Sequence, residues 1–173
     1  MEDVHEEFLA IVSEGSENVE DVMQSPYMSE EAREIFLENF EEDRANSFMG
    51  FCVMGGIFSE GIDLKNDSLI GAIIVGTGLP QVCNEREILK SYFDAMGKNG
   101  FDYAYRYPGM NKVLQAAGRV IRTKEDRGVI ALLDERFLQW EYRRLFPREW
   151  EEYTVCSHES VSNVLKNFWG GQK

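Results

Sequence analysis

The chain has few of the residues that build metal sites or disulfide frameworks. It contains three cysteines, Cys52, Cys83 and Cys156, and two histidines, His5 and His158. The cysteines are odd in number and far apart, which is typical of a protein from a reducing compartment. Their spacing matches neither a zinc site nor an iron–sulfur site. We therefore expect no metal ligands in this chain and a cytoplasmic location.

Long apolar segments are also missing. No run approaches the roughly 18 apolar residues that a membrane-spanning helix needs. The first seven residues are acidic, whereas a signal peptide begins with basic residues. We therefore expect neither secretion nor a membrane partner. With 173 residues, 43% of them hydrophobic and 12% aromatic, the composition is that of one globular domain with a substantial core.

The negative charge is concentrated at one end of the chain. The net charge is −13, and residues 1–47 hold 15 acids and 2 bases, whereas residues 48–173 hold 16 of each. Within residues 105–148 there are ten bases and five acids. The acidic segment is interpreted as solvated helix faces, with an acidic interaction surface as the alternative. The segment 105–148 is locally positive.

Apolar segments of strand length alternate with amphipathic segments of helical period. The predicted strands span 19–24, 47–54, 69–75 and 129–133. Predicted helices span 2–13, a segment capped by Ser29, a segment from Asn84 to about Met96, and a segment with Pro108 in its first turn. Apolar strands that alternate with helices indicate a parallel sheet covered on both faces. We therefore predict a three-layer α/β fold.

Two glycine-containing segments follow predicted strands. Gly55 and Gly56 come after the 47–54 strand, and Gly76-Thr77-Gly78 comes after the 69–75 strand. In parallel sheets, ligands gather in the loops after the carboxyl ends of the strands. Neither segment matches a phosphate loop or a complete dinucleotide fingerprint. For Gly76-Thr77-Gly78 we therefore favour a tight turn.

The run Gln115-Ala-Ala-Gly-Arg-Val-Ile-Arg122 carries the strongest functional signal. In a helix, Gln115, Arg119 and Arg122 stand at i, i+4 and i+7 and share one stripe. The opposite side is predicted to face the core, through Val113, Leu114, Ala117 and Ile121. Two arginines on a rigid stripe can bind phosphate oxygens bidentately. The alternative is a solvated helix end whose arginines complement the helix dipole.

The segment Ser59-Glu60-Gly61-Ile62-Asp63 and the Gln115–Arg122 run together resemble motifs V and VI of superfamily 2 helicases. The resemblance is closest to the XPD/DinG-like branch, where motif V reads S-E-G-I-D and motif VI reads Q-A-x-G-R-x-I-R. It covers about residues 1–150 and leaves residues 151–173 as an unassigned extension. It implies a RecA-like C-terminal domain, the second motor domain of an ATP-dependent DNA helicase.

The resemblance also implies roles for individual residues. Arg119 and Arg122 would reach the phosphates of ATP held by the first motor domain, with Arg122 as the arginine finger. Gln115 would position the nucleotide or the attacking water. In motif V, Asp63 would contact the ribose or brace an arginine. Gly61 would allow close approach of the backbone, and Glu60 would orient the motif VI arginines. Single-stranded DNA would be contacted by Gly55, Gly56 and Ser59.

Several parts of a complete helicase are missing from the sequence. The Walker A lysine and the acidic Mg²⁺ box belong to the first motor domain in this family, so we expect that domain to bind most of ATP and Mg²⁺. The cysteines of an iron–sulfur module are absent as well. Relatives start this domain with a buried strand, whereas Met1 falls inside the following helix. We therefore expect a sheet without its first strand, in a fragment or a gene begun at an internal methionine. A non-enzymatic protein-interaction module derived from a helicase domain is the alternative.

Overall fold

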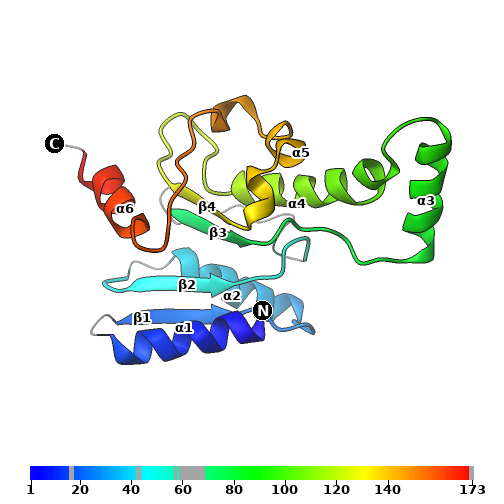
Figure 1. The fold of residues 1–173 in the computed structure, drawn as a ribbon. Helices are drawn as coiled ribbons and strands as arrows, with labels where there is room; N and C mark the ends of the chain where they lie inside the picture. The colour runs from blue at the N-terminus through cyan, green and yellow to red at the C-terminus, as the bar shows by residue number, and fades with distance from the viewer. Residues whose placement is uncertain (16–17, 42–43, 57, 59–68, 172–173) are drawn as a thin grey trace.

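The computed structural model describes residues 1–15, 18–41, 44–56, 58 and 69–171, in which helices and strands alternate (Figure 1). All four predicted strands are confirmed. The N-terminal elements are α1 (Glu2–Glu14), β1 (Val19–Met23), α2 (Glu30–Glu41) and β2 (Ser47–Phe51). The later elements are β3 (Gly71–Val75), α3 (Asn84–Ala95), η2 (Asp102–Arg106), α4 (Tyr107–Ala117), β4 (Val129–Leu133), η3 (Glu135–Leu138), α5 (Trp140–Arg143), η4 (Arg148–Trp150) and α6 (Val161–Gly170).

The strands are parallel and form two separate pairs. In the first pair Val19 of β1 lies opposite Ser47 of β2, and in the second Gly71 of β3 lies opposite Val129 of β4. The two pairs run in the same direction, with β2 and β3 as the inner strands (Figure 1). No ladder joins β2 to β3 within the described part of the chain. The predicted α/β class with parallel strands is confirmed, and the strands divide into two small sheets.

The first pair lies between two helices, and we call α1, β1, α2 and β2 the N-terminal sandwich. On one face, the rings of His5 and Phe8 in α1 lie 4.8 and 5.2 Å from that of Phe51 in β2. On the other face, Phe40 of α2 packs edge-on against Phe48, with ring centroids 4.9 Å apart. The α2 helix begins where predicted, because the Ser29 hydroxyl accepts a 3.1 Å hydrogen bond from the amide of Ala32.

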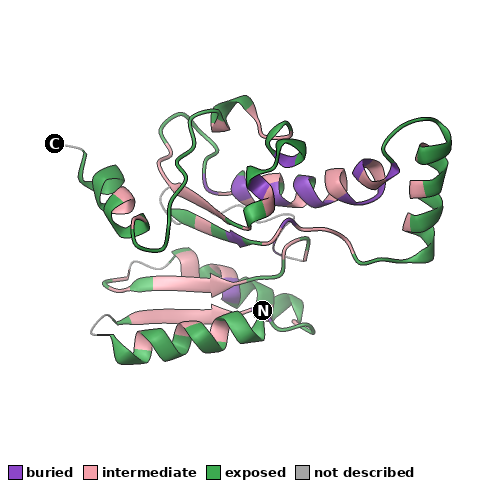
Figure 2. Ribbon diagram, in the orientation of Figure 1, coloured by how far each residue is buried: buried purple, intermediate pink, exposed green. Residues whose placement is uncertain are grey.

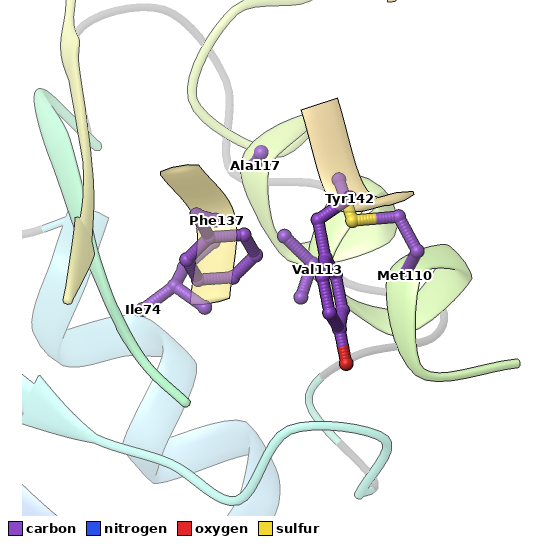
Figure 3. Packing of buried hydrophobic residues seen from close by; sticks show 6 residues of the cluster. All are labelled: Ile74, Met110, Val113, Ala117, Phe137 and Tyr142. Carbon is purple, nitrogen blue, oxygen red and sulfur yellow. The ribbon is translucent and has the colours of Figure 1, made fainter. Parts of the chain in front are cut away.

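The second pair carries the main core, and we call residues 69–150 the C-terminal layer. Its buried side chains come from β3, α4, η3 and α5 (Figure 3): Ile74, Met110, Val113, Ala117, Phe137 and Tyr142. Buried positions follow the length of α4 (Figure 2). On the opposite face of β3 and β4, three aliphatic side chains are more than half exposed: Ile73, Val75 and Leu133. The core of this layer therefore lies on one face of its strand pair.

A π-helical turn, η2, leads directly into α4. Pro108 occupies the first turn of α4, as predicted. The carboxylate of Asp102 in η2 is buried and accepts hydrogen bonds from Arg106 and from Arg144, which follows α5. This ionic cluster connects the start of α4 to the end of α5. It therefore orients the helix that carries the candidate site.

Candidate functional site

Helix α4 contacts the turns that follow both inner strands. A Cβ placed on Gly78 would lie 2.8 Å from the carbonyl oxygen of Gly109 in α4, so only glycine permits this approach. Gly76 and Gly78 have φ of +82° and +65°, values that favour glycine. The tight turn predicted at Gly76-Thr77-Gly78 is therefore confirmed, and it seats the first turn of α4 against the end of β3.

The second turn, after β2, contains Gly55 and Gly56. Gly55 has φ of +78°, and a Cβ there would lie 2.8 Å from Cε of Lys112 in α4. The buried side chain of Gln24 accepts a 2.9 Å hydrogen bond from the amide of Val53 and braces the turn. Sequence reasoning missed Gln24 and Lys112. Lys112 brings a positive charge beside Gly55, one of the two glycines that are predicted to lie near DNA.

The motif V residues Ser59, Glu60, Gly61 and Asp63 lie outside the described residues. Their predicted roles therefore stay predictions. The residue just before the motif is anchored, because Phe58 is buried and its ring stacks on Phe36 with centroids 4.2 Å apart. Phe58 is thus packed against α2.

The helix predicted to run through Arg122 ends earlier. Helix α4 ends at Ala117, and Gly118 is its C-cap. The amides of Arg119 and Val120 donate to the carbonyls of Ala116 and Ala117, which closes a tighter turn. The prediction of one helical stripe through Gln115, Arg119 and Arg122 was wrong. Gln115 lies on the helix, Arg119 lies in the turn after it, and Arg122 lies beyond.

Two interactions draw the chain away from the helix, and we call residues 118–128 the arginine loop. Val120 is buried, and Gly128 packs against it so closely that a Cβ on Gly128 would overlap its side chain. The Asp126 carboxylate accepts hydrogen bonds from the amides of Arg122 and Thr123, at 2.7 and 2.8 Å. These amides are the donors that a longer helix would need. Ile121, predicted to face the core, is 40% exposed, and Val120 takes its place.

Asp126 is the electrostatic centre of the arginine loop. The amides of Thr123 and Arg122, together with the Thr123 hydroxyl at 2.9 Å, hold the pKa of the Asp126 carboxyl below its usual value. The positive charge of Arg122 adds to this effect. Asp126 directs its oxygens to groups within the loop, so its charged form is stabilised by hydrogen bonds there. Sequence reasoning missed this role of Asp126.

The structure places the predicted site residues in two groups along α4. Gly55, which precedes Gly56, lies beside Lys112 near the middle of the helix, whereas Arg119 and Arg122 follow its end. Lys112 and Ala117 are separated by five residues, or about 7.5 Å of helical rise. Gln115 lies between the groups and is exposed. Helix α4 is therefore the rigid connection between the turn of Gly55 and Gly56, which we call the glycine turn, and the arginine loop.

Membrane-spanning helices and metal sites are both missing from the described residues. None of their helices is long and apolar enough to cross a membrane. Over the same ranges, no three or more His, Cys, Asp or Glu side chains gather as they would around a metal ion.

Comparison with known proteins identifies similar sequences and folds. The family model described as the helicase C-terminal domain matches residues 1–153. The chain is 32% identical over 115 residues to the ATP-dependent DNA helicase DinG of Photobacterium profundum, covering 65% of this chain and 16% of that protein. It is 25% identical over 138 residues to a probable ATP-dependent helicase of Methanocaldococcus jannaschii, covering 73% of this chain and 21% of the relative.

A human protein and a solved structure extend the comparison. The human regulator of telomere elongation helicase 1 is 31% identical over 130 residues, covering 70% of this chain and 10% of that protein. A solved XPD helicase has a TM-score of 0.57 at 22% identity, covering 80% of this chain and 28% of that one. The chain thus spans about a fifth or less of the length of these three sequence relatives.

Proposed function

Because the chain belongs to the helicase C-terminal domain family, we propose that it acts as the second motor domain of a DinG/XPD-like ATP-dependent DNA helicase. The observation that carries the proposal is the arginine loop. Its exposed Arg122 stands on a backbone that Asp126 braces through two amide hydrogen bonds. A cation on a braced backbone is suited to stabilising the charge that develops on a transferring phosphoryl group.

In this proposal the arginine loop completes an ATP site whose other half lies on the first motor domain. The loop fits the outer side of a triphosphate because it offers Arg119 and Arg122, while the Asp126 carboxylate is turned toward the loop's own donors. Arg122 acts as the arginine finger, and Arg119 and Gln115 position the nucleotide. Bound ATP supplies the phosphoryl group, and Mg²⁺ supplies charge neutralisation from the first domain. The 173-residue chain alone then has negligible ATPase activity.

The glycine turn supplies the proposed contact with DNA. Gly55 is exposed in the turn after β2, where Lys112 adds a cation beside it, and Gly56 closes the turn by donating its amide to the carbonyl of Val53. Amides and a lysine bind phosphate without reading bases, as a translocating motor requires. Since α4 carries both Lys112 and Gln115, a change at the nucleotide is transmitted to the DNA contact through one rigid helix.

The test is Arg122→Ala in the full-length helicase. We expect ATP turnover to fall by about a thousandfold or more, in the range of arginine-finger losses, while ATP binding is retained. Arg148→Ala is the matched control, because Arg148 is an exposed arginine in η4, outside the arginine loop. Turnover and equilibrium binding of a fluorescent ATP analogue are measured for both variants. If Arg122→Ala leaves turnover unchanged, the phosphate role of Arg122 is wrong. Absence of ATP turnover in the unsubstituted full-length protein would instead favour the non-enzymatic interaction module.

A further inference from the structure

The C-terminal helix α6 contacts the arginine loop at Arg127. The Arg127 guanidinium lies 4.6 Å from the ring centroid of Phe168 and 5.3 Å from that of Trp169. It also donates a hydrogen bond to the carbonyl oxygen of Phe168. The two rings meet edge-on, with centroids 4.9 Å apart. Arg127 is therefore held by two aromatic faces and one carbonyl.

Arg127 directly follows Asp126, the residue that braces Arg122. The loop is thus fixed at two adjacent positions: Asp126 binds the amides of Arg122 and Thr123, and Arg127 binds α6. One peptide unit joins Arg127 to Asp126, so a shift of the Arg127 backbone also shifts the backbone of Asp126. A contact in α6 is therefore mechanically connected to the backbone of Arg122.

Helix α6 lies outside the family match, which ends at residue 153. All its residues are exposed or half-buried, so deep packing does not explain its position. Cation–π contacts of this kind are worth about 0.5–1 kcal/mol at exposed sites. That is enough to bias a surface loop but too little to determine the fold.

We propose that α6, through Phe168 and Trp169, positions the arginine loop by holding Arg127. This proposal rests on the proposed function, because it assigns α6 to the same phosphate site. Arg127 and Trp169 are positioning residues: they act on Arg122 through Asp126 and touch no nucleotide. A segment beyond the matched family region thereby sets how firmly the arginine finger is presented.

The test uses the 173-residue chain and Trp169→Ala. Loss of the indole is expected to speed hydrogen exchange at the amides of Arg122 and Thr123 by roughly three- to fivefold, the equivalent of one exposed cation–π contact. It is also expected to raise the pKa of the Asp126 carboxyl toward its ordinary value, as followed by carboxyl NMR. Trp169→Phe keeps a ring beside Arg127 and should restore both readouts.

Tyr153→Ala is the matched control. The Tyr153 ring lies 5.4 Å from the guanidinium of Arg143, and Tyr153 is 39% exposed, so the variant removes a similar contact elsewhere. It should leave the exchange at Arg122 unchanged. The proposal is overturned if Trp169→Ala changes neither exchange at Arg122 nor the Asp126 pKa, or if Tyr153→Ala has the same effect. Neither readout requires ATP or the first motor domain, so this result is separable from the ATPase test of Arg122.

Discussion

The N-terminal sandwich and the C-terminal layer are built from the same unit, a pair of parallel strands, but their coverage differs. Helices lie on both faces of the sandwich, yet among the described residues its one buried apolar residue is Phe36, on which the buried Phe58 stacks from the segment after β2. The layer has its core on one face and contains the remaining nine. Coverage by helices and depth of burial are therefore separate properties in this protein. The sandwich has helices on both faces but few buried side chains, whereas the layer is packed on one face and buries many.

The two regions also divide the charge and the chemistry. Residues 1–47, almost all of the sandwich, hold 15 acids and 2 bases, while the positive segment 105–148 belongs to the layer. The arginine loop begins where α4 ends, and α4 contributes three of the six side chains in the main core. Binding of a phosphate is weaker when the protein groups that contact it must first become ordered. A rigid support under the arginine loop therefore favours binding. The deeper region is accordingly the one that presents the arginines.

The largest expected effect comes from the ionic cluster of the layer. Asp102→Ala leaves the cations of Arg106 and Arg144 without their buried partner, and we expect it to lower the free energy of unfolding by about 3–5 kcal/mol. The sandwich provides the comparison. Asp21→Ala removes a half-buried 2.6 Å hydrogen bond to His5 and should cost about 1 kcal/mol. Urea unfolding measures both, and equal losses would contradict the difference in depth between the two regions.

The next largest effect is a difference in stability loss between substitutions on the two faces of β3. Ile74 is 5% exposed and faces the core, whereas the adjacent Ile73 is 59% exposed. Ile74→Ala should lower the free energy of unfolding by about 3 kcal/mol, the usual loss for a buried isoleucine. Ile73→Ala should cost less than about 1 kcal/mol, because its side chain already contacts solvent. Urea unfolding of the two variants is a direct comparison, and a loss at Ile73 as large as that at Ile74 would show that its face is covered in solution.

Much of the fold could be predicted because its signals are local. Short apolar runs located all four strands, Ser29 located the start of α2, and Pro108 located the first turn of α4. The π-turn before α4 was not predicted, since it accompanies a buried Asp102 whose partner Arg144 is 42 residues away. The pairing of the strands into two sheets is likewise a long-range property that runs of residues do not encode.

The residues of the candidate site were predicted from the sequence, but the backbone conformation that carries the two arginines was not. The helical period that grouped Gln115, Arg119 and Arg122 ignores Asp126, which competes for the amides that would continue the helix. Gly118 was the available local signal, because glycine is a weak helix former and often ends helices. Lys112 lies near Gly55 because the fold packs α4 against the turn after β2. The sequence around Lys112 showed no local sign of this contact.

The smallest effect concerns pH and is local to the arginine loop. The folded structure lowers the pKa of the Asp126 carboxyl, chiefly through the amides of Thr123 and Arg122, so its bracing is complete above the unfolded pKa of about 3.9. The bracing is lost as the pH falls through the lower, folded-state pKa. We therefore expect hydrogen-exchange protection at the Arg122 amide, corrected for intrinsic rates, to stay constant from about pH 7 to pH 5 and to decrease below about pH 4.

The amide of Val53 is the internal control for this pH dependence. It donates to Gln24, an uncharged acceptor, at 2.9 Å, so its protection should not follow the carboxyl titration. Asp126→Asn should likewise remove the pH dependence at Arg122, because asparagine does not titrate in this range. Loss of protection at Val53 and Arg122 together would indicate acid unfolding of the whole chain. Loss at Arg122 alone would show that the loop is braced by the Asp126 charge, independently of the core beneath it.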